Sequence, residues 1–338
     1  MIPHNLPTIG KEEEDAALRV LRSKQLSQDA EVELFENEFC DYLGLSRGSA
    51  VALSNGTSSL FMALKILNAK GKKILFPGYV CSALRHAVSM AGGIENTVDV
   101  EPNSPNLNMS IIKQNLPDIS IIPHMYGIPI QIDADDTLVI EDCCQALGAK
   151  VKNQMVGLSG DVAIFSFYAT KLMTSGGQGG MFVSKNQEYV DAVRDYREFD
   201  LRNDSEKRFN FKMTDLQAAI GRVQLKKLPY FLKRREEIFQ YYKKSGLDLL
   251  DIDDELRGIL EPVRYRAILK TKNPRKLVNS LESVGVQSII PTEDWELLGQ
   301  REFLPNALKF SHETISIPIY PSLTKEHLDI ILSGLVIK

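Results

Sequence analysis

Short apolar runs alternate with turn-rich or helical stretches from residue 49 to residue 171, and this alternation is the strongest constraint on the fold. The runs lie in the segments SAVALSNGTSSLFMALKIL, KKILFP, IENTVDV, DISIIPHMYG, DTLVIEDCC and DVAIFSFYATK. Apolar runs bounded by turn signals indicate buried strands, and their alternation with helices favours a largely parallel sheet. Because ligands gather at the carboxyl ends of parallel strands, we expect the functional residues at that edge.

Helical periodicity predicts the elements that flank this sheet. One is an amphipathic helix in DAEVELFENEFCDYLG, which ends at Gly44, a C-terminal cap. Another is a long helix through QAAIGRVQL and FLKRREEIFQYYKKSG, which Thr214 and Gln217 open as a capping box. Beyond it, RYRAILK, NPRKLVNSLESVGV, TISIPIY and TKEHLDIILSGL indicate further strands and helices.

A chain of 338 residues exceeds the usual span of one hydrophobic core. We therefore expect an α/β protein with two domains, divided along the long helix. Residues 1–225 would form a large domain, a mostly parallel sheet flanked by helices, and residues 226–338 a smaller C-terminal α+β domain. The first part of the chain, to about residue 25, can pack outside the large domain.

Composition excludes some classes of partner. The formal charge of -4 and the pI near 5.9 give no basic field for a nucleic acid. The N-terminus has no cationic region before an apolar run, and no apolar stretch approaches the length of a membrane span, so we expect a cytoplasmic protein without membrane contact. The four cysteines show no metal-ligand spacing, and we expect all four to be reduced.

The segment DVAIFSFYATKLMTSGGQGGMF places a lysine where a buried strand meets a glycine-rich bend. Its strand ends with Ser166, Thr170 and Lys171. An arbitrary lysine is usually a solvated surface charge, so neighbouring motifs must decide whether Lys171 does chemistry.

Two neighbouring motifs favour a chemical role. Asp142 closes the apolar run TLVIED, and a buried carboxylate there needs a cationic partner such as the pyridinium nitrogen of pyridoxal 5'-phosphate, although Asp142 could equally cap a helix. In SNGTSSL, Gly56 allows close backbone approach, while Thr57 and Ser58 offer hydroxyl and N–H groups at a helix N-terminus. That motif predicts a phosphate site or, alternatively, an ordinary helix cap.

Phosphate motif, carboxylate and lysine, in this order, resemble the DegT/StrS-type sugar aminotransferases, which are fold-type I pyridoxal-phosphate enzymes. The resemblance runs from PTIGKEEEDAALRVLRSKQLSQ through QAAIGRVQL to SIPIYPSLT. It implies a fold-type I aminotransferase-like architecture, in which residues 1–225 form the large pyridoxal-phosphate-binding domain.

The resemblance also assigns residues to the cofactor. It implies that the cofactor phosphate is bound by the residues of one turn and one strand end, Gly56, Thr57, Ser58 and Ser166. In FPGYVCSA it implies that Tyr79 stacks on the cofactor ring, although core packing is the alternative for this side chain. In VIEDCCQALGA it pairs Asp142 with the ring nitrogen and Gln145 with the ring hydroxyl. In FSFYATK it implies a Schiff base on Lys171.

Two further positions follow from the resemblance. Asn210 in RFNFKMTDLQAAIG matches an asparagine that reaches the phosphate bound by the neighbouring subunit, which implies a homodimer with composite active sites. An asparagine before an aromatic residue is otherwise an ordinary loop residue. His124 of PHMYG matches a position near the active site, where it would face the substrate.

The implied reaction moves an amino group, with glutamate as the donor, to a keto-sugar attached to a nucleotide, with ping-pong kinetics. A sugar dehydratase of the same family replaces the lysine with histidine, so Lys171 argues against it. Two alternatives stay open: a keto-cyclitol as acceptor, and a cofactor-binding regulatory protein without turnover.

Substrate-facing segments depart from the family pattern. Segment 127–140 lacks the helix that relatives usually insert there. DYREFDLRND lacks the common Arg-Asn-His-Gly, and IIPTEDWELLGQ replaces the usual loop that contains Tyr-Pro. The cofactor is therefore better specified by the sequence than the acceptor.

Overall fold

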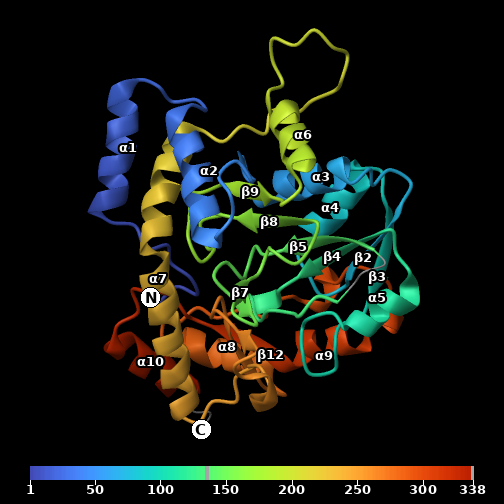
Figure 1. The fold of residues 1–338 in the computed structure, drawn as a ribbon. Coiled ribbons are helices and arrows are strands. Elements are labelled where there is room, and N and C mark those ends of the chain that lie inside the picture. The colour runs from blue at the N-terminus through green and yellow to red at the C-terminus, as the bar shows by residue number, and fades with distance from the viewer. Residues whose placement is uncertain (134–136, 336–338) are drawn as a thin grey trace.

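A computed structural model describes residues 1–133 and 137–335 (Figure 1). Its helices are α1 (Lys11–Ser23), α2 (Ala30–Leu43), α3 (Gly56–Ile66), α4 (Ala83–Met90), α5 (Met109–Asn115), α6 (Gln187–Arg197), α7 (Asp215–Lys244), α8 (Pro274–Ser283), α9 (Pro305–Glu313) and α10 (Lys325–Leu335). Its strands are β1 (Ala50–Leu53), β2 (Lys73–Pro77), β3 (Ile94–Val98), β4 (Ile119–Pro123), β5 (Leu138–Asp142), β6 (Lys150–Val151), β7 (Gln154–Met155), β8 (Val162–Ser166), β9 (Gly180–Val183), β10 (Leu260–Glu261), β11 (Ala267–Lys270) and β12 (Thr314–Ile317). None of the helices in these ranges is long and apolar enough to cross a membrane.

A seven-stranded sheet forms the centre of the molecule, in the order β1-β9-β8-β5-β4-β2-β3. Strands β8, β5, β4, β2 and β3 run parallel to one another, while β9 pairs antiparallel with both β8 and β1. The predicted α/β class and the largely parallel sheet are thus confirmed. The antiparallel pair at one edge follows from the hairpin that carries the glycine-rich bend between β8 and β9.

Successive strand residues point to opposite faces of this sheet, and both faces are covered. In β1, Val51 and Leu53 belong to a core with residues of α3 and α4, whereas Ala50 and Ala52 belong to a core with residues of α2 and α7. Figure 1 shows these helices on the two sides of the sheet. Apolar residues on both faces explain why these strands read as continuous apolar runs.

Helix α7 connects the sheet to a second core. Its first half contributes Leu225 and Leu228 to the sheet core, and its second half contributes Ile238 and Tyr242 to a cluster with β11, β12, α8 and α10. The capping box of Thr214 and Gln217 is present as predicted. The division predicted at residues 225/226 falls inside this helix and stays a prediction.

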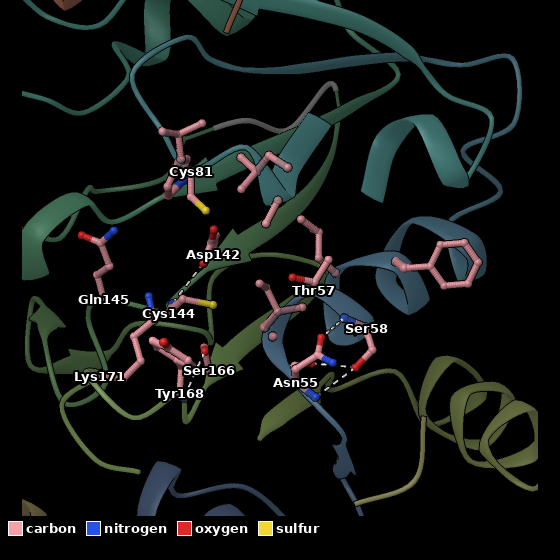
Figure 2. A pocket seen from close by; sticks show the side chains of 18 of the residues that line it. Asn55, Thr57, Ser58, Cys81, Asp142, Cys144, Gln145, Ser166, Tyr168 and Lys171 are labelled. Atoms are coloured by element: carbon pink, nitrogen blue, oxygen red, sulfur yellow. Dashed lines mark hydrogen bonds between the residues drawn. The ribbon is translucent and has the colours of Figure 1, made fainter. Parts of the chain in front are cut away.

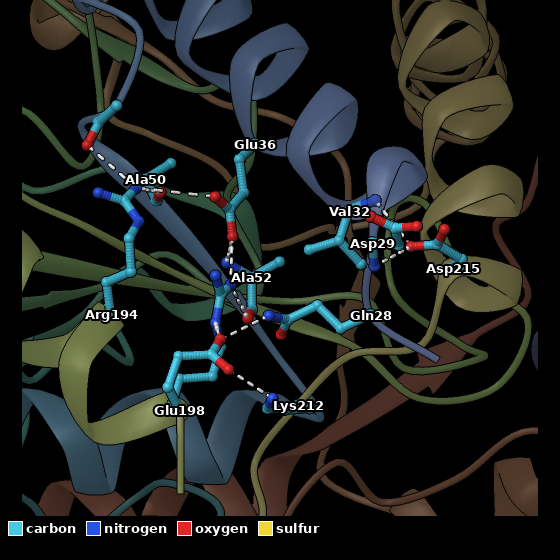
Figure 3. A network of polar contacts seen from close by, with 12 residues as sticks. Gln28, Asp29, Val32, Glu36, Ala50, Ala52, Arg194, Glu198, Lys212 and Asp215 are labelled. Atoms are coloured by element: carbon cyan, nitrogen blue, oxygen red, sulfur yellow. Dashed lines mark hydrogen bonds and ion pairs between the residues drawn. The ribbon is translucent and has the colours of Figure 1, made fainter. Parts of the chain in front are cut away.

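Asp215, the first residue of α7, caps the neighbouring helix α2. Its carboxylate accepts backbone N–H bonds from Asp29 (2.8 Å), Val32 (3.2 Å) and Glu31 (3.3 Å), as Figure 3 shows in part. Asp29, at the N-cap position, makes no side-chain cap bond itself. The N-terminus of α2 is therefore held by a residue far along the chain, and α2 ends at Gly44 as predicted, with φ +74°.

Buried charge ties α2 to the sheet and to α6 (Figure 3). The Glu36 carboxylate accepts bonds from the Arg197 guanidinium and from the backbone N–H of Ala52 (2.8 Å). Arg197 also donates to the Ala52 carbonyl (3.0 Å). The two opposite charges offset each other inside the core, and their bonds to Ala52 hold the edge strand β1, which α3 follows.

The N-terminal arm, residues 1–10, contacts the C-terminal part of the chain. Ile2 exchanges backbone hydrogen bonds with the segment after α8, donating to Gly285 (2.7 Å) and accepting from Gln287 (2.9 Å). The His4 Nε2 atom lies 2.8 Å from the Ser316 hydroxyl and 3.2 Å from an Arg266 nitrogen. The arm then returns toward the sheet, where the Asn5 side chain donates to the Thr170 carbonyl. Whether the first part of the chain packs outside a large domain stays a prediction.

His4 should make stability dependent on pH. Burial, followed by the charges of Arg266 and Arg235, lowers its pKa from 6.5 to about 3. Between these two pKa values the unfolded chain binds a proton at His4 and the folded chain does not. The contribution of neutral His4 to the free energy of unfolding is therefore fully present above pH 6.5 and is lost as the pH falls toward 3. We expect a loss of about 1–2 kcal/mol in the free energy of unfolding at about pH 5.

Urea unfolding at neutral and at mildly acidic pH measures this loss. The variant His4→Gln should show a smaller drop between the two conditions than the wild type. The exposed His86 offers a matched control, since His86→Gln should keep the full drop. An equal drop in wild type and His4→Gln would show that His4 does not carry it.

Candidate active site

A cavity of about 620 Å³ opens at the carboxyl edge of the sheet. Asp142 ends β5 and is in register with Pro123 of β4 and Ile164 of β8, and all three line the cavity. Figure 2 shows the side chains around it, with α3 on one side and the segment after β8 on the other. The site therefore lies where the parallel-sheet argument predicts.

Lys171 reaches the cavity from a tight turn after β8. Its N–H donates to the Tyr168 carbonyl (2.9 Å), and Ala169 N–H donates to Gly177 (3.0 Å) in the glycine-rich bend. Gly177 has φ +129°, which disfavours any residue with a side chain. From outside, the Asn5 side chain donates to the Thr170 carbonyl (2.9 Å), so the turn is fixed on both sides.

The Lys171 amine has no hydrogen bond or ion pair within residues 1–133 and 137–335, and it lies 5.3 Å from the centroid of the Tyr265 ring. Burial lowers the pKa of this amine, but Tyr265, Cys144 and Asp142 act against burial and raise it above its usual value. The amine thus faces the cavity without a hydrogen-bonding partner among the residues that the structure describes.

The turn from β1 into α3 is a capped helix N-terminus. This is the alternative that the sequence offered beside a phosphate site. The Asn55 side chain accepts from the Ser58 N–H (2.8 Å), and the Ser58 hydroxyl donates to the Asn55 carbonyl (2.7 Å). Thr57 is exposed. Within residues 1–133 and 137–335, the N–H groups of Gly56 and Thr57 make no hydrogen bond. These two groups and the Thr57 hydroxyl can bind an anion, while Ser58 holds the turn in shape.

Glycine is required where this turn approaches the sheet. A Cβ on Gly56 would lie 2.9 Å from the Ser166 Cβ and 3.2 Å from its Oγ. A Cβ on Gly180, in β9, would lie 2.3 Å from the Asn55 carbonyl oxygen. Close approach brings the Ser166 hydroxyl beside the first N–H groups of α3, the arrangement expected of a phosphate site.

Asp142 and Gln145 face the cavity from the end of β5 (Figure 2). One Asp142 oxygen accepts from the Cys144 N–H (3.0 Å), and no cationic side chain in the described ranges forms an ion pair with Asp142. The Gln145 oxygen accepts from the Tyr126 N–H (2.8 Å), which leaves its NH2 group to donate into the cavity. Both side chains thus present the groups that the resemblance requires.

Tyr79 lies behind the cavity wall instead of on it. Its side chain is fully buried, its ring packs against Phe310 with centroids 5.7 Å apart, and its hydroxyl accepts from Tyr126 (2.9 Å). The alternative of core packing therefore describes this residue. Two positions later, Cys81 is exposed and lines the cavity.

His124 lines the cavity, but both of its ring nitrogens are engaged. Nδ1 accepts from the Ile130 N–H (3.0 Å), so Nε2 carries the proton and donates to Glu141 (3.1 Å). The Glu141 carboxylate also accepts the N–H groups of Gly157 (2.8 Å) and Gly160 (2.7 Å). Neither nitrogen is left for a substrate, nor for a metal ion shared with nearby Glu141 and Cys143.

Asn210 is exposed on the segment between α6 and α7, and its side chain accepts from the Lys212 N–H (3.1 Å). It lies outside the residues that line the cavity of its own chain, whereas nearby Phe211 does line it. Exposure is what a residue that acts on a neighbouring subunit requires.

Sequence reasoning did not assign Asn55, Cys81, Cys144 or Tyr265 to the site. Asn55 could have been found, because Asn before the first helical residue is a standard cap. Tyr265 could not, because it reaches Lys171 from a segment almost a hundred positions later.

Residues present in the cavity fit pyridoxal 5'-phosphate. Asp142 is a carboxylate without a cation, and Lys171 is an amine without a hydrogen-bonding partner among the described residues. In the described part of the chain, neither the Gln145 NH2 group nor the first N–H groups of α3, beside Ser166, make a hydrogen bond. The phosphate, the ring nitrogen and the aldehyde of pyridoxal 5'-phosphate would each meet a complementary group: the start of α3, Asp142 and Lys171.

Known proteins match the chain over nearly its whole length. The model of the DegT/DnrJ/EryC1/StrS aminotransferase family matches residues 7–336. The spore coat polysaccharide biosynthesis protein SpsC of Bacillus subtilis (strain 168) is 27% identical over 379 residues, which cover 98% of this chain and 96% of SpsC. A UDP-4-amino-4,6-dideoxy-N-acetyl-beta-L-altrosamine transaminase of Campylobacter jejuni subsp. jejuni serotype O:23/36 (strain 81-176) is 30% identical over 358 residues, covering 96% of this chain and 93% of the relative.

The fold itself also has close counterparts. The crystal structure of the aminotransferase TlmJ from Streptoalloteichus hindustanus matches with a TM-score of 0.90 at 22% identity, over 99% of this chain and 98% of TlmJ. The aminotransferase-like architecture expected from the sequence motifs is thus confirmed.

Replacing Gly56 should damage the phosphate site. In Gly56→Ala the new Cβ meets Ser166, and relieving such overpacking typically costs 1–3 kcal/mol. We expect the dissociation constant of pyridoxal phosphate, measured by absorbance titration, to rise on the order of tenfold. Gly10→Ala, whose Cβ has its nearest atom at 3.8 Å, is the control that should bind like wild type. Unchanged affinity in Gly56→Ala would contradict the assignment.

Proposed function

This chain belongs to the DegT/DnrJ/EryC1/StrS aminotransferase family and is an aminotransferase, and we propose that it moves an amino group from glutamate to a nucleotide-linked keto-sugar with pyridoxal 5'-phosphate held on Lys171. One observation carries the proposal: the Lys171 amine and the Asp142 carboxylate line the same cavity, opposite the start of α3. The amine, the acid and the anion site are the three contacts that this cofactor needs.

When bound, pyridoxal phosphate supplies an electron sink for the carbanion next to the transferred amino group. Asp142 would accept a hydrogen bond from the protonated ring nitrogen and so keep that nitrogen charged. Gln145 donates its NH2 group to the ring hydroxyl, and it is oriented for this by the Tyr126 N–H bond. The N–H groups of Gly56 and Thr57, with the Ser166 hydroxyl, hold the phosphate.

Lys171 both carries the cofactor and moves protons. Released by the amino donor, its amine stays in the cavity, because the turn that carries it is fixed by Ala169 and Thr170. With the cofactor bound, the amine would take a proton from the donor Cα and deliver it to C4′ of the cofactor. The same steps in reverse act on the keto acceptor, so kinetics should be ping-pong.

The acceptor is supported by the relatives rather than by the cavity. The Campylobacter jejuni relative is named as a transaminase of a UDP-linked amino sugar. Among the described residues that line the cavity, however, Lys171 is the only lysine or arginine, and many others are apolar. A nucleotide diphosphate needs cationic or N–H partners, so part of its site would come from outside this chain.

A second copy of the chain can supply that part. We propose a homodimer with composite active sites, in which the exposed Asn210 reaches the phosphate held by the neighbouring subunit. Size-exclusion chromatography with light scattering tests the dimer, and a monomer with full activity would rule it out. Recovery of activity on mixing Lys171→Ala with Asn210→Ala subunits would test the shared site.

A keto-cyclitol is the second candidate acceptor, since an uncharged ring needs no cation and suits the largely apolar lining. The altered segment IIPTEDWELLGQ lies near the site: the Leu298 N–H donates to the Gly78 carbonyl (2.9 Å), just before Cys81. Part of segment 127–140 lies outside the described residues. Assays with a panel of nucleotide keto-sugars and keto-cyclitols, with glutamate as donor, separate the two, and turnover with neither favours a regulatory protein.

The cofactor assignment has a direct optical test. Purified wild-type protein with pyridoxal phosphate should show a visible absorbance band that resists dialysis, and glutamate should bleach it. Lys171→Ala should lose the covalent band, and activity should fall by at least about a thousandfold, because both the attachment and the proton-moving group are gone. Lys185→Ala, on the surface after β9, is a control that should behave as wild type. A band unaffected by every amino donor would refute transamination.

A further inference from the structure

Two cysteine thiols line the cavity, and the reaction proposed above does not use them. Cys81 is exposed and follows β2, and Cys144 is partly buried and follows β5. The remaining cysteines, Cys40 and Cys143, are buried in the core on the other side of the sheet. Two of the four cysteines thus present their thiols to the site.

The two thiols lie on either side of the acid that would hold the ring nitrogen. In Figure 2 the Asp142 carboxylate lies between the sulfur atoms of Cys81 and Cys144, with Lys171 to one side. All four groups line the same cavity. They are also close enough for their charges to affect one another, since Asp142, Lys171 and Cys81 all influence the pKa of Cys144, which burial raises well above its usual value.

The aromatic side chain of this wall is turned away. Tyr79 packs in the core against Phe310 and is bonded to Tyr126, so it presents no ring to the cavity. Opposite, a Cβ on Gly56 would lie 3.4 Å from the Cys144 sulfur, which places that sulfur beside the phosphate end of the site. The space next to Asp142 is thus bounded by sulfur where a stacked ring would otherwise be expected.

We propose that Cys81 and Cys144 contact opposite faces of the cofactor ring, and that the bound ring covers the Cys81 thiol. The proposal rests on the pyridoxal phosphate site described above. Sulfur is polarizable and packs well against aromatic rings, but it covers less of the ring than an aromatic side chain does. Binding of the ring should therefore depend mainly on Lys171, Asp142 and the phosphate contacts, and Cys81 becomes accessible whenever the ring leaves.

Alkylation with iodoacetamide tests whether the bound cofactor ring covers the Cys81 thiol. In this reaction the thiolate sulfur of the cysteine displaces iodide from carbon, and the thiol proton passes to the buffer. We expect rapid labelling of Cys81 in protein stripped of cofactor and labelling at least about tenfold slower in protein loaded with pyridoxal phosphate, measured by peptide mass spectrometry. Cys40 and Cys143 should stay unlabelled in both forms, because they are buried. Equal labelling of Cys81 in both forms, or none in either, would overturn the proposal.

Cofactor affinity tests the contacts themselves. Loss of a sulfur–ring contact in Cys81→Ala, or in Cys144→Ala, should raise the dissociation constant of pyridoxal phosphate about two- to tenfold and shift the visible band. Ser82→Ala is the matched control, since Ser82 is exposed next to Cys81 and makes no cap bond. Wild-type affinity and an unshifted band in both cysteine variants would exclude ring contact.

The visible band separates this proposal from the one on which it rests. If loaded wild-type protein shows no band that depends on Lys171, the cofactor assignment fails. If the band is present and Cys81 is labelled equally with and without cofactor, the cofactor assignment stands and only the thiol contact is wrong.

Discussion

The buried Glu141 carboxylate is the interaction on which the geometry of this site depends. It accepts the His124 ring N–H and the backbone N–H groups of residues 157, 159 and 160, so it connects β4, β5 and the turn before β8. Burial raises its pKa, but His124 and these N–H groups outweigh burial and hold the pKa below the usual value. A charge satisfied so completely costs little to bury and strongly disfavours any other arrangement of the strand ends.

The bonds of Glu141 also set the position of Asp142, the next residue of β5. Because successive residues of a strand alternate, Asp142 points to the opposite face of the sheet. Within residues 1–133 and 137–335 no cationic side chain forms an ion pair with it. Of the two neighbouring acids, Glu141 therefore has a structural role and Asp142 is left for chemistry. Glu141 has all its partners within the protein, whereas Asp142 has an incomplete set and faces a cavity that also contains the Lys171 amine. Acids that a fold leaves unpaired beside a cavity are candidates for ligand binding.

Local patterns predicted much of this architecture and the order of its cofactor groups. Apolar runs predicted the strands β2, β4, β5 and β8, and turn and capping residues predicted the starts of α3 and α7. Both signals act within a few residues, so they can be recognised in the sequence. Side-chain direction after a strand end is different. Whether Tyr79 or Cys81 enters the cavity depends on packing against Phe310, a residue of α9 that no nearby pattern reveals. The sequence also predicted His124 near the site. It could not predict that the His124 ring is hydrogen-bonded to Glu141, because Glu141 lies on another strand.

The N-terminal arm has a mechanical consequence. Its first residues are paired with the segment after α8, His4 contacts β12, and Asn5 holds the carbonyl next to Lys171. The ring of Tyr265, which precedes β11, touches the same lysine from the C-terminal part of the chain. The position of the peptide beside the amine therefore depends on contacts from the first residues of the chain and from its C-terminal part.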